Sequence, residues 1–218
     1  MDRIVMDFLE DLQLNNNRDW FNANKDRYEE AKATMEKFVD KLIPGLLRID
    51  PSIGTLTAKQ TMFRIYRDVR FSKDKSPYKL HFGAFMAQGG RKSDKAGYYL
   101  HVGVDDCFIG GGSHSPSGEQ LKKIRSEIYY NVDEFKAIIN NKKFAQTFRI
   151  FEDDKLKRPP QGFPADFPDL ELLKYKHYTV FQPMDKNRVI NDDFDKHVLK
   201  VFETMKPFIT FLNRALDG

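Results

Sequence analysis

The chain of 218 residues is long enough for one large domain or two small ones, and its hydrophobic share of 40% is sufficient for a buried core. A net charge of +4 permits an acidic partner but falls short of the strongly basic balance typical of nucleic-acid-binding domains. The single cysteine, Cys107, excludes an intrachain disulfide, and no apolar run suits a signal peptide or a membrane span, so we expect a cytoplasmic protein.

The N-terminal part of the chain has helical patterns. A short helix is predicted from Ile4 to Leu12 and a long one from about Arg18 to Leu47, because apolar residues recur there at spacings of three and four. Asparagines at positions 15–17 separate the two helices and can cap the second. Pro44 is expected to kink or restart the long helix, because proline lacks an N–H and its ring crowds the preceding turn.

The middle of the chain has the alternation of apolar residues that is typical of strands. Asp105 and Asp106 are expected to form a tight turn that joins the last two strands into a hairpin. The predicted strands are Phe63–Tyr66, Leu80–Ala87, Tyr98–Val104 and Cys107–Gly110.

The C-terminal part returns to helices. Ser117 and Gln120 form a capping box that begins one helix, and a long amphipathic helix is predicted from Asp192 to Leu216. Between them, a late strand at His177–Gln182 must return to the sheet. This order favours a single α+β domain over residues 1–218, with a largely antiparallel or mixed sheet packed by long N- and C-terminal helices.

Residues 63–79, here called the basic segment, carry three arginines and three lysines against two aspartates, interleaved with four aromatic rings. Guanidinium groups match phosphate with paired hydrogen bonds and rings stack on planar groups, so the segment predicts a surface for an anionic ligand. In a regular strand Arg67 would fall in the apolar register and would need an anionic partner, either an acidic side chain or a ligand. Internal salt bridges with a solvated loop are the structural alternative.

Two other stretches add candidates for the same site. The start of the long helix could hold an anion, although Trp20 could equally anchor the helix to the core. The glycine run before Ser117 could present backbone N–H groups, or could be a tight structural turn. The predicted ligand-binding residues are Arg18, Trp20, Lys25, Arg64, Tyr66, Arg67, Arg70, Lys75, Tyr78, Lys79, Gly111 and Gly112.

The histidines give weaker signals. His81 and His101 are expected to lie close together on neighbouring strands, but two histidines without a third ligand make a poor metal site, so no metal is predicted. If the chain is an enzyme, Asp68 and His177 are the candidates for a general base.

Several long motifs occur in order along the chain: Asn16–Phe21 with Asn24–Lys25 and Tyr28, Arg64–Lys79, Gly110–Gly112 with Pro116–Ser117, and Leu156–Pro160 with Gly162–Phe163. Together these motifs resemble one family, known as domain of unknown function 2461 and found widely in bacteria and in some fungi. The resemblance spans nearly the whole chain and implies a single α+β domain in an intracellular protein. It implies no established activity, cofactor or catalytic residue.

Three functions are compatible with these patterns. The leading hypothesis is a binding module for an anionic, phosphorylated ligand, either a small molecule or a nucleic acid. The second is an enzyme acting on a phosphorylated or carboxylated small molecule, with Arg67 and Arg70 as the anion clamp. The third is a structural or protein-interaction domain, which would be favoured if Arg67 and Arg70 were paired with internal acids.

Overall fold

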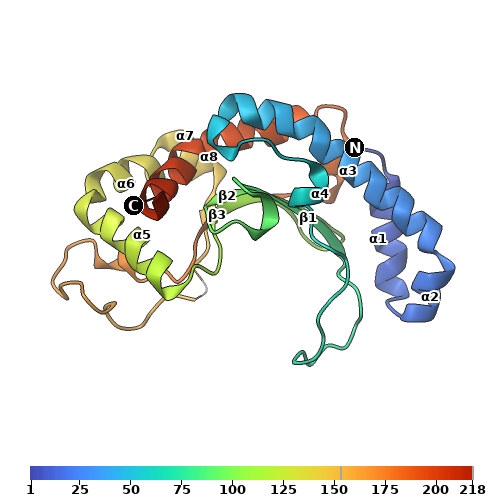
Figure 1. The fold of residues 1–218 in the computed structure, drawn as a ribbon, viewed down its shortest axis with the longest axis horizontal. Coiled ribbons are helices and arrows are strands. Elements are labelled where there is room, and N and C mark those ends of the chain that lie inside the picture. Colours follow the sequence, from blue (N-terminus) through green and yellow to red (C-terminus); the bar gives the residue numbers. More distant parts are fainter. Residues whose placement is uncertain (153, 218) are drawn as a thin grey trace.

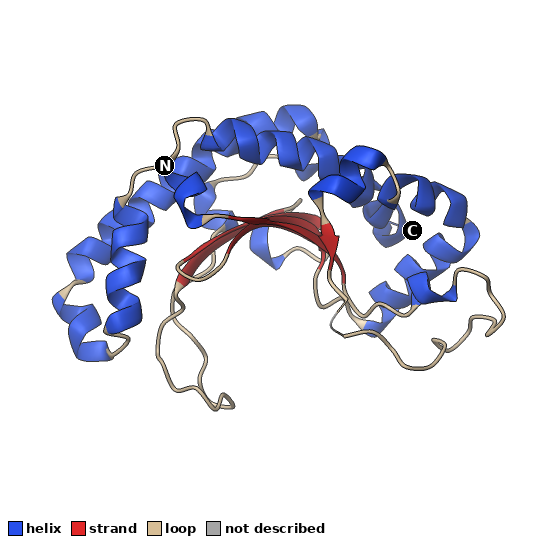
Figure 2. Cartoon of the chain, turned by 180° about the vertical axis from the view of Figure 1, so that it is seen from behind, coloured by secondary structure: helices blue, strands red, loops and turns tan. Residues whose placement is uncertain are grey.

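The computed structural model describes residues 1–152 and 154–217 and has an α+β fold in the shape of an arch (Figure 1). Long helices form the convex side of the arch, and a curved antiparallel sheet lies beneath them (Figure 2). The α-helices are α1 (Ile4–Leu14), α2 (Arg18–Ala23), α3 (Lys25–Ile49), α4 (Ala58–Thr61), α5 (Gly118–Tyr130), α6 (Val132–Ile139), α7 (Lys142–Thr147) and α8 (Phe194–Asp217). The strands are β1 (His81–Met86), β2 (Gly97–Gly103), β3 (Cys107–Ser113), β4 (Arg149–Ile150) and β5 (Tyr178–Met184).

The long helix predicted near the N-terminus is two helices. The Asn17 side chain caps α2 by accepting from the Trp20 N–H at 2.9 Å, and Asn24 separates α2 from α3. Pro44 lies inside α3 without interrupting it, so the expected restart at this residue is wrong. The next residue, Gly45, lies directly against Leu199 of α8, and a β-carbon at residue 45 would overlap that side chain.

The strands pair antiparallel in the order β1-β2-β3-β5-β4. The hairpin across Asp105 and Asp106 is confirmed, as is the return of the late strand, which pairs with β3 along its whole length. The short strand β4 was not predicted, because two residues are too few to show alternation.

The predicted strand at residues 63–66 does not form. Met62 and Tyr66 make only isolated bridges, to Ala84 and Tyr78 respectively. Arg67 therefore occupies no regular strand, so the apolar register that a strand would have given it does not apply. Proline and the many charges of the following residues favour a loop here over a second long ladder.

Helices α3 and α8 cover one face of the sheet. The side chains that point toward them are fully buried, and the hydroxyl of one of them, Tyr98, donates to Asp50 Oδ2 at 2.8 Å. The opposite side of the sheet, here called the open face, looks into the hollow of the arch between two long loops (Figure 2). One of these loops is the basic segment, which hangs from the sheet beside β1 (Figure 1).

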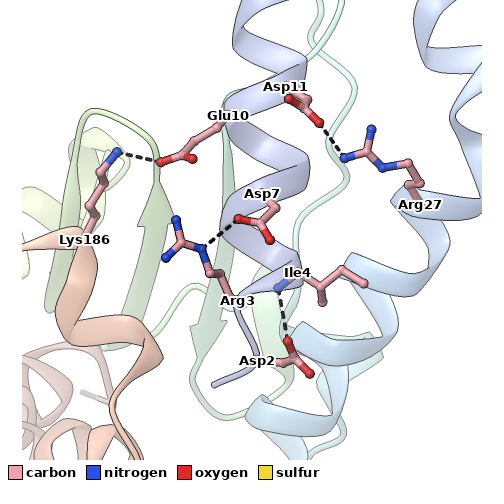
Figure 3. Close-up of polar contacts among 8 residues, drawn as sticks. All are labelled: Asp2, Arg3, Ile4, Asp7, Glu10, Asp11, Arg27 and Lys186. Carbon is pink, nitrogen blue, oxygen red and sulfur yellow. Dashed lines mark hydrogen bonds and ion pairs between the residues drawn. The ribbon is translucent and has the colours of Figure 1, made fainter.

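Helices α1 and α2 form an arm at one end of the arch (Figure 1). Ion pairs on the surface of α1 hold it: Glu10 meets Lys186 at 2.6 Å, and Asp11 meets Arg27 of α3 at 2.5 Å (Figure 3). Exposed pairs of this kind contribute less than about 1 kcal/mol each, so their main effect is on orientation.

Candidate functional site

The base of the basic segment is fastened to the arm. The side-chain amide of Asn16 donates to the Tyr78 carbonyl at 3.0 Å and its oxygen accepts from the Tyr78 N–H at 3.2 Å. The Tyr78 ring stacks on Phe21 with centroids 3.9 Å apart, and the Tyr66 ring meets the edge of the same phenylalanine. Tyr78 is only 4% exposed, so its ring belongs to the core and is not free to stack on a ligand, whereas Tyr66 is 41% exposed.

Two arginines of the segment are paired inside it. Arg67 binds Asp74, and Arg70 grips Asp68 through two hydrogen bonds, Nε to Oδ1 at 2.9 Å and Nη2 to Oδ2 at 2.7 Å. These hydrogen bonds hold the pKa of both aspartates below the ordinary range. Arg67 and Arg70 therefore brace the loop, which is the arrangement the structural alternative expects, and an Asp68 bound in this way is a poor general base.

Arg64 and Lys79 are placed differently, where the segment joins the sheet. The Lys79 ammonium donates to the Arg64 carbonyl at 3.0 Å and lies 5.6 Å from the centre of the Phe63 ring. Burial lowers the pKa of Lys79, and the positive charge of Arg64 lowers it further. Neither cation forms an ion pair with any residue that the structure describes. We call this pair of unneutralised cations the basic neck.

A second group of cations faces the arm. An open hollow of about 500 Å³ lies between the start of α2 and the basic segment, and Arg18 and Lys75 both line it. Lys75 donates to the Val69 carbonyl at 3.0 Å, and within the described chain neither cation has an acidic partner. Trp20 does not line this hollow, and its ring packs on Phe8, with centroids 6.2 Å apart. Lys25 is exposed at the start of α3 and does not line the hollow either.

Gly111 and Gly112 lie elsewhere, inside β3. A β-carbon at residue 111 would overlap the Met205 sulfur of α8, and one at residue 112 would overlap the Tyr178 carbonyl of β5. These glycines allow close packing in the sheet and are no anion loop. They lie at the far end of β3 from Cys107, roughly 17 Å away at the usual rise per residue, so the structure does not bring them to the basic segment.

His177 also lies at that far end. Its Nδ1 accepts from the Ser115 N–H at 3.0 Å, and its ring stacks on His114 with centroids 5.0 Å apart. Asp68 lies in the basic segment beside β1 and His177 beside the other end of the sheet, so the two predicted catalytic candidates do not form one site.

The open face of the sheet carries a cluster of which the sequence indicated only the pair His81 and His101. His101 lies between Tyr99 and Asp106, with its Nδ1 3.2 Å from the Tyr99 hydroxyl and its Nε2 3.1 Å from Asp106 Oδ1. The Phe108 ring stacks on His101 at 4.5 Å, and the His81 ring is 4.1 Å from it, as expected for neighbouring strands. The sequence did contain a signal for the cluster: along residues 97–103, polar and aromatic side chains occupy the positions that alternate with the apolar ones.

Burial keeps the histidines and Tyr99 of this cluster uncharged near neutral pH. Loss of solvent, aided by the nearby His101 and Lys79, lowers the pKa of His81 to about 4. Burial also lowers the pKa of His101, although the Asp106 carboxylate opposes the shift, and it raises the pKa of Tyr99 to about 12. Among residues 1–152 and 154–217, no three histidine, cysteine or acidic side chains are placed to hold a metal ion.

Comparison with known proteins gives one match. A family model described as a conserved hypothetical protein, DUF2461, matches residues 4–211. The chain belongs to this family. The DUF2461 match includes the basic segment, the open face and the arm, but its description assigns no activity to any of them. No curated protein and no solved structure shows significant similarity to the chain. No helix in the described residues has the length and apolarity needed to cross a bilayer.

Proposed function

We propose that this DUF2461 protein binds an anionic, phosphorylated ligand at the basic neck, with the cations of the hollow as secondary contacts. The observation that carries the proposal is that Arg64 and Lys79 lie close enough for their charges to repel, and that neither forms an ion pair with a described residue. Two adjacent cations repel one another, and an anion held between them converts that repulsion into attraction. The cytoplasmic setting we propose suits the unpaired, buried thiol of Cys107.

The chemistry of the two cations suits a phosphate. Arg64 is exposed and can offer a planar guanidinium to two phosphate oxygens, whereas the half-buried Lys79 offers a compact charge. Arg67 and Arg70, which the sequence put forward as the anion clamp, already have carboxylate partners and would have to give them up. The neck therefore binds an anion at a lower cost than the rest of the segment.

The test is a thermal-shift titration with pyrophosphate, which stabilises the folded state in proportion to its occupancy. We expect a concentration-dependent rise in Tm for the wild type, and Arg64→Gln should weaken the apparent affinity at least tenfold, about 1.4 kcal/mol. Lys37→Gln removes one exposed charge from α3, far along the chain from the neck, and serves as the matched control. A wild type that no phosphate compound stabilises, or equal effects of the two variants, would overturn the proposal.

A further inference from the structure

Aromatic rings on the open face lie over glycines. The Tyr99 side chain of β2 reaches across Gly83 of β1, so that a β-carbon at residue 83 would overlap its hydroxyl and lie 3.1 Å from its Cζ. Phe85 of β1 reaches in turn across Gly97 of β2, with its Cζ 2.9 Å from a β-carbon built there. A side chain that fills the space above a neighbouring strand lies along the sheet instead of standing away from it. The glycines thus let both rings lie low on the sheet.

The same arrangement continues on the next strand. The Phe108 ring lies 3.5 Å from a β-carbon built at Gly110 of β3, and its edge meets Phe181 of β5 with centroids 6.1 Å apart. The rings on β1, β2, β3 and β5 therefore form one aromatic strip across four adjacent strands. Each of these rings is partly exposed, on the side of the sheet opposite the long helices (Figure 2).

Cations lie at both borders of this strip. On the β1 side, the Phe63 ring meets the edge of Tyr99 at 6.3 Å and carries the Lys79 ammonium above it. On the other side, Arg149 of β4 is exposed and stands opposite Phe181 in the sheet register, so both point to the open face. The rings of the strip carry no charge, and the Asp106 carboxylate reaches the same face at His101, 3.1 Å from its Nε2. An uncharged aromatic surface with cations at its edges is complementary to a chain of planar rings linked by phosphates.

We propose that the open face is a stacking platform for the bases of a single-stranded nucleic acid whose phosphates contact the basic neck and Arg149. The inference rests on the proposed function, because the neck supplies part of its phosphate contacts. Four strands span roughly 14 Å, which accommodates two or three bases. A duplex is excluded as the occupant because its base faces are already stacked within the helix.

The small number of cations sets the strength of binding. About three phosphate contacts predict that the logarithm of the affinity falls with the logarithm of the salt concentration with a slope of about −2. So few phosphate contacts are in keeping with the net charge of only +4 for the whole chain. Stacking should therefore supply a large share of the affinity, and removal of one ring should weaken binding as much as removal of one charge.

The experiment measures fluorescence anisotropy of a labelled eight-nucleotide oligouridylate at low salt, with the full chain. We expect Phe108→Leu to weaken binding at least fivefold, because it keeps an apolar side chain but removes the ring face. Tyr130→Leu removes a ring that is 78% exposed on α5 and should leave binding unchanged. An abasic strand of the same length, which keeps the phosphates and lacks the bases, should bind at least tenfold more weakly.

A second measurement guards against loss of folding in the variants. An oligonucleotide with 5-iodouracil, irradiated with the wild-type protein, should crosslink to peptides of β2 or β3. Crosslinks confined to the arm or to the convex helices would overturn the inference.

The outcomes separate the platform from the proposed function. If the abasic strand binds as tightly as oligouridylate and Arg64→Gln weakens both, the platform is wrong and the anion site stands. If pyrophosphate stabilises the protein and oligouridylate does not bind, the platform is again wrong and the anion site stands. If a neutral cello-oligosaccharide binds instead and Phe108→Leu abolishes it, the face binds sugars and the nucleic-acid inference falls. If neither pyrophosphate nor oligouridylate binds, both proposals fail.

Discussion

Arg64 and Arg67 lie three residues apart and look alike in the sequence, yet their surroundings differ. Arg67 has Asp74 as a partner across the loop, whereas Arg64 has the Lys79 ammonium next to its carbonyl and, among the described residues, no ion-pair partner. The electrostatic role of an arginine depends on what lies within a few ångströms, and the path of the loop decides that. Charge composition alone could find the basic segment but could not say which cation is free.

The backbone of Gly112 permits a specific test. Its φ of +122° is rarely adopted by residues with a β-carbon, and that atom would also overlap the Tyr178 carbonyl. We expect Gly112→Ala to lower the free energy of unfolding by about 2–4 kcal/mol, measured by urea unfolding. Gly89 has a φ of +87° with nothing within 4 Å of its β-carbon position, so Gly89→Ala should cost only about 1 kcal/mol. Equal losses of unfolding free energy in the two variants would mean that the contact of residue 112 with Tyr178 of β5 adds nothing to the cost.

The histidines of the open face predict a pH dependence. His81 has a pKa of about 4 in the folded protein and about 6.5 when unfolded, so the unfolded chain binds more protons between these values. Stability should therefore fall as the pH drops from about 6.5 towards 4. Urea midpoints at pH 7 and pH 5 measure this, and His81→Asn should lose less between the two than the wild type. An unchanged loss in the variant would assign the effect to other groups, of which His101 is the nearest.

At the scale of elements, the basic segment has no regular structure and depends on its fastening. Its base is held by the Asn16 amide, which makes both hydrogen bonds that the Tyr78 backbone offers there. Backbone hydrogen bonds from the Arg67 N–H to the Pro77 carbonyl at 2.9 Å and from the Lys79 N–H to the Ile65 carbonyl at 2.8 Å join the two sides of the base. Further out, the loop has ion pairs between largely exposed groups, which contribute little to stability. Asn16, between α1 and α2, therefore joins the arm to the base of the segment, next to Lys79.

Removal of this fastening gives an element-scale prediction. Asn16→Ala should lower the free energy of unfolding by about 1–2 kcal/mol, because the partly buried Tyr78 backbone groups lose their partners. It should also speed trypsin cleavage within residues 63–79, because the base of the loop opens more often. Asn22→Ala changes an exposed asparagine of α2 and is the matched control. Unchanged cleavage in Asn16→Ala would show that the loop is held by the aromatic stack on Phe21 instead.

At the scale of the whole molecule, the chain closes on itself. Strand β5, late in the sequence, pairs with β3 in the middle of the sheet, and α8 packs on α3, so both ends of the chain contribute to the same layers. The arch leaves the open face between the arm and the helices α5 to α7 (Figure 1). Both proposed binding surfaces lie on the hollow side of this arch or at its edge.

This topology predicts one cooperative unit over residues 1–218. Far-UV circular dichroism reports all helices, whereas the fluorescence of Trp20, the single tryptophan, reports the arm. We expect the two signals to give coincident urea transitions, as two-state unfolding requires. An earlier transition of Trp20 fluorescence would show that the arm unfolds separately from the sheet.

How much could be predicted differs between elements. Periodicity located β1, β2, β3, β5 and α8 within a few residues, because each has one buried face and the alternation records it. It missed the break at Asn24, because the helical spacing continues across it. It assigned residues 63–66 to a strand, because the alternation of side chains there resembles that of a strand. For the site, the candidate cations Arg64 and Lys79 were among the predicted residues, but the open face was not.

The sequence by itself determined the family, because its motifs match those of the family along residues 4–211. It also determined the α+β class, the antiparallel hairpin and the position of the basic segment, because these depend on local periodicity and composition. Only the tertiary structure decided which cations are neutralised, which rings are buried and which face of the sheet stays uncovered. Those properties depend on pairs such as Arg67 with Asp74 and Tyr99 with Gly83, which belong to different turns or strands. Contacts between distant residues leave no periodic signal, so the fold had to bring them together before they could be seen.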